Sequence, residues 1–167
     1  MSSTELVPST GAPVQQATAG SHDGRQFLTF RIGGEEYGLD ILRVQEIRSY
    51  EAPTRVANAP AFVKGVVNLR GVIVPILDLR VRLGQNAEYN AFTVVIVLNV
   101  ANRIVGIVVD SVSDVLALQP DEIKPRPEVP AAMDARYITG LGKLGERMLI
   151  LLDIESMIKS PDFGLVD

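Results

Sequence analysis

The sequence predicts a mainly β protein. Valine and isoleucine supply 21 and 13 of its 167 residues, and such β-branched side chains pack better on a pleated sheet than in a helix. Apolar and polar residues alternate over several short runs, and glycine-containing pairs separate these runs as hairpin turns would. Segments with helical character are few and short.

The first predicted hairpin begins at Phe27. Residues 27–32 alternate in polarity, and residues 37–41 alternate again. Between them, Gly33-Gly34 supplies a two-residue turn, because glycine adopts positive φ without steric cost.

A second hairpin is predicted from residues 66–69 and 72–77, joined by Arg70-Gly71. Pro75 lacks the backbone N–H that a strand donates, so its strand is expected to lie at a sheet edge or to carry a bulge.

Three further apolar runs have the length and composition of strands: 93–98, 103–109 and 147–152. Two short helices are expected at 79–83, stopped by Gly84, and at 154–159, capped by Asp153.

Two stretches of the chain resemble each other by spacing. Positions within 37–47 match positions within 105–115 at an offset of 68, and positions within 65–79 match 140–154 at an offset of 75. The proline-rich insert 120–130 accounts for the difference. This order predicts a duplicated unit, and hence two small antiparallel barrels side by side. Chance similarity between two valine-rich segments is the alternative.

The composition disfavours several kinds of chemistry. Cysteine is absent and His22 is the single histidine, so disulfides, thiolate metal sites and most side chains that titrate near neutral pH are missing. The net charge of −4 does not favour nucleic acid, whose binding needs clustered Lys and Arg. No run approaches the ~18 apolar residues of a membrane span. We expect a cytoplasmic protein without enzymatic activity, cofactor or metal.

Three motif-like patterns are assigned to structure instead of catalysis. Residues 140–145 fit G-x-G-x-x-G, but the strand-like run 147–152 follows instead of the helix that a dinucleotide site needs. Ser21-His22-Asp23 are contiguous and cannot converge as a catalytic triad. The carboxylates near 110–114 and 153–155 suit turns and helix caps.

Val44, Glu46 and Arg70 are the candidates for binding. In an extended chain Val44 and Glu46 project from one side, and Arg70 lies at a hairpin tip. An apolar side chain between opposite charges is typical of the edge of a docking groove. An ordinary exposed ion pair is the alternative interpretation. Arg80 and Arg82 fit either an interface or a solvated helix face.

Long ordered matches carry a family resemblance: residues 37–47 and 60–80, continued by 105–116 and 137–155. These segments resemble the CheW family of bacterial chemotaxis coupling proteins, over about residues 27–158. The resemblance implies two Src-homology-3-like five-stranded β-barrel lobes packed side by side, with short helices and a hydrophobic seam between the lobes.

The expected domain organisation follows from the resemblance and from composition. Residues 1–25 are rich in Ser, Thr, Ala, Gly, Gln and Pro without periodicity, which predicts a disordered tail. A CheW-like domain spans 26–160, with approximate lobes 27–90 and 91–159, and exchange of strands between the lobes is left open. Residues 161–167 form a C-terminal tail.

The resemblance also implies a function. Proteins of this family are non-enzymatic adaptors that couple methyl-accepting chemotaxis receptors to the histidine kinase CheA and so control kinase activity. The implied partners are the cytoplasmic tip of the receptors and the CheA regulatory domain, with no nucleic acid and no direct membrane insertion. The protein is expected to be monomeric alone, to join ternary complexes and arrays, and to be recruited to the inner face of the membrane through receptors. A paralogue that scaffolds a different receptor and kinase array is the alternative.

Positions in the family pattern imply the contact residues. Receptor contact falls on Val44, Glu46, Gly65, Arg70, Ile73 and Val95. Kinase contact falls on Ile123, Lys124, Pro125 and Glu128. Val129 stands where an aromatic residue can occur in the family, which leaves the kinase contact less defined.

Overall fold

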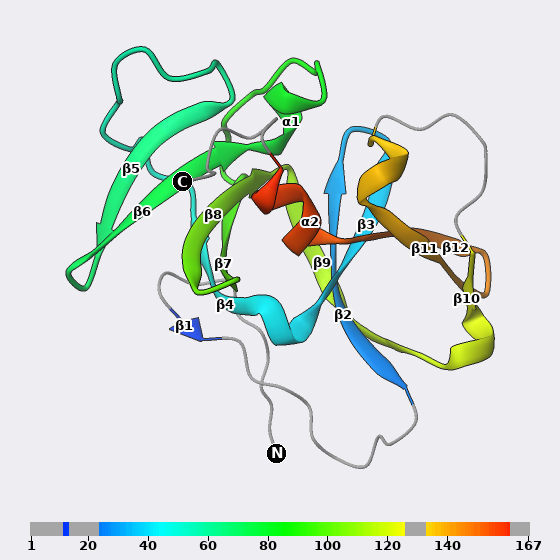
Figure 1. Cartoon of the computed structure of the whole chain (residues 1–167). Helices are drawn as coiled ribbons and strands as arrows, with labels where there is room; N and C mark the ends of the chain where they lie inside the picture. The colour runs from blue at the N-terminus through cyan, green and yellow to red at the C-terminus, as the bar shows by residue number, and fades with distance from the viewer. Residues whose placement is uncertain (1–11, 14–23, 126–132, 161–167) are drawn as a thin grey trace. The chain divides into compact units, whose positions relative to one another are not determined.

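The structure, a computed structural model, describes residues 12–13, 24–125 and 133–160 (Figure 1). Its strands and short helices confirm the mainly β prediction. The described residues form two compact units: unit 1 comprises 12–13 and 43–111, and unit 2 comprises 24–42 and 112–160. Most of the predicted tails 1–25 and 161–167 lies outside the described residues. Within the first tail, however, Ala12–Pro13 form a short strand.

Unit 1 is built on one six-stranded sheet. Its strands, in spatial order, are β1 (Ala12–Pro13), β4 (Val44–Ser49), β7 (Val94–Val100), β8 (Arg103–Val109), β6 (Val72–Asp78) and β5 (Val63–Leu69). Neighbouring strands are antiparallel except β6 and β8, which run parallel. The helix α1 (Leu79–Arg82) follows β6 directly, and Asp78 caps it by accepting a hydrogen bond from the backbone N–H of Arg80.

Unit 2 is built on a second six-stranded sheet. Its strands, in spatial order, are β10 (Ile123–Lys124), β11 (Ile138–Leu144), β12 (Arg147–Leu152), β3 (Glu35–Asp40), β2 (Arg25–Ile32) and β9 (Ser111–Leu118). Here β12 and β3 are the parallel pair. The helix α2 (Ile154–Lys159) follows β12, and Asp153 caps it. Three single-turn 3₁₀ helices complete the described elements: η1 (Ile41–Arg43), η2 (Pro120–Glu122) and η3 (Ala135–Tyr137).

The two sheets share one topology. The order β4-β7-β8-β6-β5 in unit 1 corresponds to β9-β2-β3-β12-β11 in unit 2. The registers agree at the predicted offsets: Leu28 pairs with Leu39 as Ile96 pairs with Ile107. Likewise β5 and β11 both carry a register shift near the start of the strand. A shared order and shared registers favour duplication over chance similarity.

The observed units differ from the predicted lobes 27–90 and 91–159. The hairpin β2–β3 belongs to the sheet of the C-terminal strands, and β7–β8 belongs to the sheet of β4 to β6. Each repeat therefore contributes a hairpin to the sheet of the other repeat. The parallel pairs make this exchange, and glycine allows them to pack: a Cβ at Gly38 would lie 2.8 Å from Leu151, and one at Gly106 would lie 2.8 Å from Ile76.

Each unit has its own apolar cluster. The cluster of unit 1 consists of Leu69, Val74, Ile76, Val95, Val97 and Val108. The cluster of unit 2 consists of Phe27, Leu118, Leu149 and Leu151. Burial of each such side chain contributes about 1.5–3 kcal/mol, so these clusters hold the strands that carry the candidate site residues.

The prediction for Pro75 is wrong in one respect. Its strand, β6, lies between β5 and β8 and not at an edge. Parallel pairing with β8 begins only at Ile76, one residue after Pro75. The hairpin does carry a bulge, but it lies on β5, between Val63 and Gly65. The interior position is tolerated because the proline precedes the second ladder.

Candidate functional site

Glu46 and Arg70 come together in unit 1. Glu46 lies on β4 and is 3% exposed. Arg70 and Gly71 form the turn between β5 and β6, with φ of 52° and 91°, as a two-residue hairpin turn requires. The turn is fixed further because the N–H of Gly71 donates to Asn68 Oδ1 at 2.8 Å.

Two arginines bind the buried carboxylate. Arg70 Nη2 donates to Glu46 Oε1, and Arg48 Nη1 donates to Glu46 Oε2 at 3.0 Å. Burial alone would raise the pKa of Glu46, but the hydrogen bonds and charges of Arg70 and Arg48 outweigh it and hold this pKa below its ordinary value. The side chain of Arg70 remains 60% exposed. A buried anion therefore fixes the position of an accessible cation.

The prediction that Val44 and Glu46 project from the same side of the strand is wrong. A register shift between these residues pairs Val44 with Leu98 and Glu46 with Val97. Adjacent residues of β7 face opposite sides of the sheet, and the bulge at Gln45 therefore separates the two side chains. The sequence alone gave no sign of this bulge.

A small cavity adjoins the ion pair. It has a volume of about 100 Å³ and is lined by Arg48, Ser49, Glu51, Val67, Asn68, Leu69, Ile76, Val95 and Val97. Val95, predicted as a contact residue, is 5% exposed and forms part of the floor. Ile73, on the hairpin that carries Arg70, is 59% exposed. The site combines apolar surface with a held positive charge, as protein-binding sites commonly do.

Gly65 lies beneath the backbone of a neighbouring segment. It is buried, with a φ of +142°, and a Cβ there would collide with the carbonyl oxygen of Thr54. Thr54 and Val66 exchange backbone hydrogen bonds of 2.9 and 2.8 Å at this crossing. Gly65 can therefore influence the binding of a partner only indirectly, by allowing the Thr54 segment to pack onto β5.

The predicted kinase-binding residues lie in unit 2, as far as they are described. Ile123 and Lys124 form β10, which pairs with Gly142 and Leu141 of β11. Pro125 follows and is exposed. Glu128 lies outside the described residues, as does Val129.

Unit 2 also pairs a carboxylate with an arginine. Asp114 stands at the position equivalent to Glu46, whereas its partner Arg147 does not correspond to Arg70, whose equivalent is Gly145. Arg147 Nη1 donates to Asp114 Oδ2 at 3.1 Å, and Arg147 Nη2 donates to Glu36 Oε2 at 2.6 Å. The hydrogen bond from Arg147 lowers the pKa of Asp114, against the effect of burial, and Thr29 adds a further hydrogen bond. The repeat offset of 68 relates Asp114 to Glu46, but sequence reasoning did not identify this network.

Sequence reasoning also missed a buried network at the cap of α1. Arg80, for which the sequence allowed either an interface or a solvated helix face, is 2% exposed. Its guanidinium contacts Asp78 at 2.9 Å and Asp110 at 3.1 Å. The Tyr89 hydroxyl donates to Asp78 Oδ2 at 2.6 Å. Asp78 has a lowered pKa because Arg80 and Tyr89 outweigh the effect of its burial.

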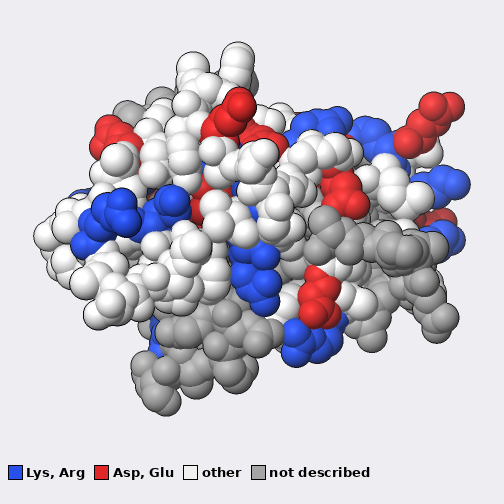
Figure 2. All heavy atoms as spheres, turned by 90° about the horizontal axis from the view of Figure 1, so that it is seen from above, with Lys and Arg blue, Asp and Glu red and all other residues white. Residues whose placement is uncertain are grey.

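The three ion-paired carboxylates are poorly suited to general acid–base catalysis. Glu46, Asp78 and Asp114 all have lowered pKa values, whereas a general acid–base catalyst needs a pKa near the operating pH. Within the described ranges, no cluster of three or more His, Asp and Glu residues could hold a metal ion. On the face in Figure 2, charges of both signs are interspersed. No helix in the described part of the chain is long and apolar enough to cross a membrane.

Comparison with known proteins gives consistent matches over most of the chain. The family described as the CheW-like domain matches residues 26–162. A chemotaxis protein CheW of Klebsiella aerogenes is 59% identical over 150 residues, which is 89% of this chain and 90% of that protein. A chemotaxis protein CheW of Rhizobium meliloti is 36% identical over 143 residues, 85% of this chain and 92% of that protein. The crystal structure of the scaffolding protein TtCheW from Thermoanaerobacter tengcongensis matches with a TM-score of 0.76 and 27% identity, covering 83% of this chain and 95% of that one.

Proposed function

This chain belongs to the CheW-like family, and from that premise we propose that it is a non-enzymatic adaptor that couples methyl-accepting chemotaxis receptors to the histidine kinase CheA. The adaptor acts in the cytoplasm and is recruited to the membrane through the receptors. The observation that carries the proposal is the Glu46–Arg70 pair, in which a buried carboxylate presents an exposed cation beside apolar surface.

The receptor side of the adaptor lies on unit 1. Arg70 supplies the charge, Ile73 supplies exposed apolar surface, and Val95 lies at the floor of the adjoining cavity. Glu46 holds Arg70, whereas the bulge at Gln45 separates the side chain of Val44 from this pair. Gly65 has a positioning role, because it lets the Thr54 segment pack onto β5.

The kinase side lies on unit 2, at Ile123, Lys124, Pro125 and Glu128. The backbone supports part of this assignment, since β10 adds to the edge of the sheet beside β11. Edge segments with exposed side chains are suited to contacts with another polypeptide. Separate units then carry separate contacts, so one partner need not displace the other.

The receptor contact should be weak by itself. A few buried aliphatic anchors contribute about 1.5–3 kcal/mol each, whereas association costs an estimated 4–15 kcal/mol in lost rigid-body freedom. We expect a micromolar dissociation constant for a single contact, which corresponds to a binding free energy of about −8 kcal/mol. Simultaneous receptor and kinase contacts raise the effective concentration, so a complete assembly is much firmer than any one joint.

Reconstitution tests the proposal directly. Purified full-length protein is co-sedimented with receptor-containing membranes, with and without CheA, and CheA autophosphorylation is measured in the same mixtures. We expect the protein to pellet with the membranes and to make CheA activity depend on receptor ligand. Failure to pellet with receptors, or CheA activity unaffected by the protein, contradicts the proposal.

A further inference from the structure

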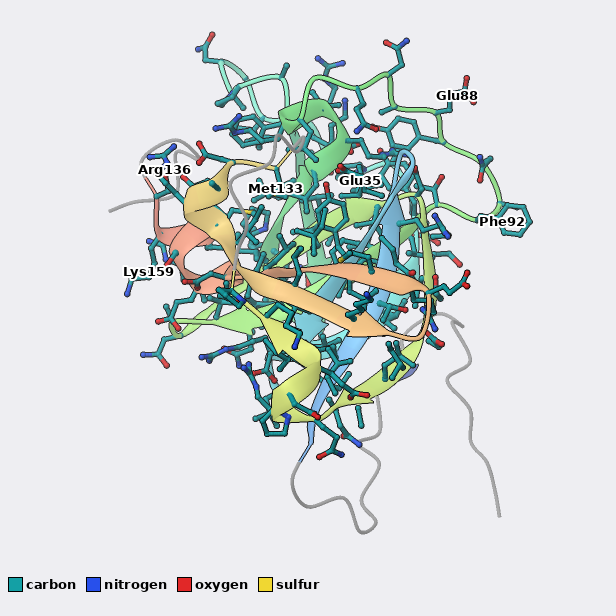
Figure 3. All side chains as sticks on the ribbon, turned by 90° about the vertical axis from the view of Figure 1, so that its right-hand side faces the viewer. Glu35, Glu88, Phe92, Met133, Arg136 and Lys159 are labelled. Carbon is teal, nitrogen blue, oxygen red and sulfur yellow. The ribbon has the colours of Figure 1, made fainter. Side chains whose placement is uncertain are left out.

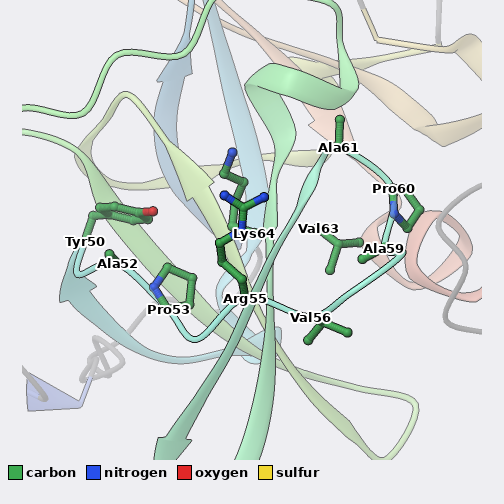
Figure 4. A pocket seen from close by; sticks show the side chains of 10 residues that line it. All are labelled: Tyr50, Ala52, Pro53, Arg55, Val56, Ala59, Pro60, Ala61, Val63 and Lys64. Atoms are coloured by element: carbon green, nitrogen blue, oxygen red, sulfur yellow. The ribbon is translucent and has the colours of Figure 1, made fainter.

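A second pocket of unit 1 lies apart from the Glu46–Arg70 site. It has a volume of about 290 Å³, between the end of β4 and the start of β5 (Figure 4). Pro53, Val56, Pro60 and Val63 supply apolar lining. Small-molecule sites typically span about 300–1,000 Å³, so this pocket suits a single large side chain better than a metabolite.

Two cations give the pocket a positive edge. Arg55 and Lys64 both line it and extend in the same direction in Figure 4. Arg55 is exposed, and within the described residues it has no carboxylate partner. Val56 is 46% exposed, so the apolar lining is also open to a partner. The pocket, called here the socket, fits an apolar side chain next to a negative charge.

Another loop of unit 1 carries both an exposed aromatic side chain and an exposed carboxylate. Phe92, in the connection between α1 and β7, is 74% exposed, the highest exposure among the large apolar side chains in the described part. Figure 3 shows Phe92 and Glu88 on this connection, pointing away from the ribbon. Glu88 is exposed and makes no side-chain ion pair with a described residue. These two residues are called the knob.

Hydrogen bonds fix the backbone that carries the knob. The Phe92 N–H donates to Asn90 Oδ1 at 2.8 Å, and the Asn90 N–H donates to the hydroxyl of buried Thr93 at 2.9 Å. Arg80 Nη1 donates to the carbonyl of Glu88 at 2.8 Å. A loop tied at several points loses little entropy on binding, and a rigid aromatic side chain is an efficient anchor.

The buried network at α1 provides one of these contacts, the hydrogen bond from Arg80 to Glu88. A buried ion pair is weak evidence for stability, but this one also positions neighbouring side chains. Here Asp78 and Arg80 fix Tyr89, whose ring stacks on Tyr50 of the socket with 4.4 Å between centroids. Lys64 lies 5.9 Å from the centre of the same ring. One cluster therefore positions both the knob and a wall of the socket.

We propose that the knob of one copy of this chain docks in the socket of a second copy, with Phe92 in the apolar pocket and Glu88 against Arg55. The volume and apolar lining of the pocket, together with the opposite charges of Glu88 and Arg55, favour this occupant. Each copy carries both halves, so two copies can exchange knobs or pass the contact to a third copy. The proposal does not depend on receptor or kinase binding.

The expected contact is weak. One aromatic anchor and one charge pair cover far less than the ~1,200 Å² of a standard interface. We expect a dissociation constant on the order of 100 µM to 1 mM. The chain is therefore monomeric when dilute, and the contact forms where copies are concentrated.

Sedimentation velocity of the purified full chain, from ~10 µM to ~1 mM, tests this inference. We expect the weight-average sedimentation coefficient to rise with concentration in the unmodified chain. Phe92→Ser should weaken self-association at least ~10-fold. Leu42→Ser is the matched control, because Leu42 is 71% exposed and lies in neither feature; it should leave self-association unchanged.

A charge exchange makes the test specific. Glu88→Arg and Arg55→Glu should each weaken self-association, and the double variant should restore it, because the pair is re-formed with reversed sign. A concentration-independent monomer at ~1 mM, an equal loss in Leu42→Ser, or the absence of restoration in the double variant overturns the proposal. Receptor pelleting of Phe92→Ser, measured separately, reports on the adaptor function and not on this contact.

Discussion

Units 1 and 2 each place a carboxylate at the equivalent position and pair it with arginine, but they expose the paired groups differently. In unit 1 the carboxylate Glu46 is 4% exposed in its side chain and Arg70 is 60% exposed. In unit 2 the carboxylate Asp114 is 44% exposed and Arg147 is 37% exposed. Unit 1 holds one carboxylate with two arginines, whereas unit 2 holds one arginine between two carboxylates.

This difference shows that the shared topology fixes where the carboxylate lies on the sheet, and that the side chains around it determine which charge is exposed. Counting formal charges, the network of Glu46, Arg48 and Arg70 is positive, and the network of Asp114, Glu36 and Arg147 is negative. Electrostatic complementarity controls specificity and association rate more than raw affinity. The two units, which share one topology, therefore carry ion-pair networks of opposite net charge.

The helix caps give the strongest contrast between the units. Asp78, which caps α1, is fully buried and binds Arg80 and Tyr89. Asp153 occupies the equivalent place in unit 2 and only caps α2, through the N–H and hydroxyl of Ser156. We expect Asp78→Ala to lower the free energy of unfolding by about 3–5 kcal/mol, because it leaves Arg80 buried without its main partner.

The matched change, Asp153→Ala, should cost about 1 kcal/mol, the usual effect of losing a cap. Urea denaturation of both variants provides the measurement. Equal losses in the two variants would contradict a special role for the buried network of unit 1.

The crossing glycines provide a second contrast. Gly65 supports Thr54 in unit 1, and Gly140 supports Lys124 in unit 2, where a Cβ would lie 2.6 Å from the Lys124 carbonyl oxygen. Only Gly65 combines this close approach with a positive φ. Gly65→Ala should therefore cost about 2–4 kcal/mol, from strain and overpacking together.

Gly140→Ala should cost less, about 1–2 kcal/mol, because the backbone there is unstrained. Gly34→Ala is the control, since a Cβ at Gly34 meets nothing within 4 Å. Chemical denaturation measures all three variants. A larger loss for Gly140→Ala than for Gly65→Ala would show that the positive φ of Gly65 is not under constraint.

The pH dependence of stability gives the smallest contrast. The folded state lowers the pKa of Glu46 below its ordinary value of 4.5. Its contribution is therefore complete above that value and is lost as the pH falls through the folded pKa. Glu46→Gln should cost about 1–2 kcal/mol at neutral pH, and this difference from the unmodified chain should shrink as the pH falls below ~4.

Asp114→Asn should show the same sign with a smaller amplitude, because Asp114 is more exposed and its charge is better screened. Unfolding free energies measured between pH 7 and pH 3 check both variants. A difference for Glu46→Gln that grows on acidification would contradict the assigned direction of the pKa shift.

Local chemistry made much of the fold predictable. Alternating polarity and turn residues predicted the hairpin at Gly33-Gly34, and Asp153 predicted the start of α2. The offsets of 68 and 75 predicted the repeat. The exchange of hairpins could not be predicted from these offsets. The two repeats resemble each other equally well whether each hairpin joins the sheet of its own repeat or that of the other repeat. Long-range parallel pairing decides that choice, and it leaves no local signal.

The candidate site was predictable only in part. Glu46 and Arg70 stood out in the sequence because Glu46 lies in an apolar run beside Val44 and Arg70, of opposite charge, lies at a hairpin tip. The bulge at Gln45 has no sequence signal, so the expected common face of Val44 and Glu46 was wrong. Arg80 also misled, since a short helix with arginines is usually solvated, and only tertiary contacts with Asp78 and Tyr89 bury it.

Receptor binding by two charge-reversed variants tests the central claim most directly. Arg70→Glu and Arg147→Glu each reverse the arginine that holds the equivalent carboxylate, in unit 1 and unit 2 respectively. Arg70→Gln removes the charge without placing a second carboxylate beside Glu46, and far-UV circular dichroism verifies that each variant is folded. In co-sedimentation with receptor-containing membranes, we expect both changes at Arg70 to weaken binding at least ~10-fold and Arg147→Glu to bind like the unmodified chain. Unchanged binding by folded Arg70→Glu, or an equal loss in Arg147→Glu, would contradict a receptor surface on unit 1.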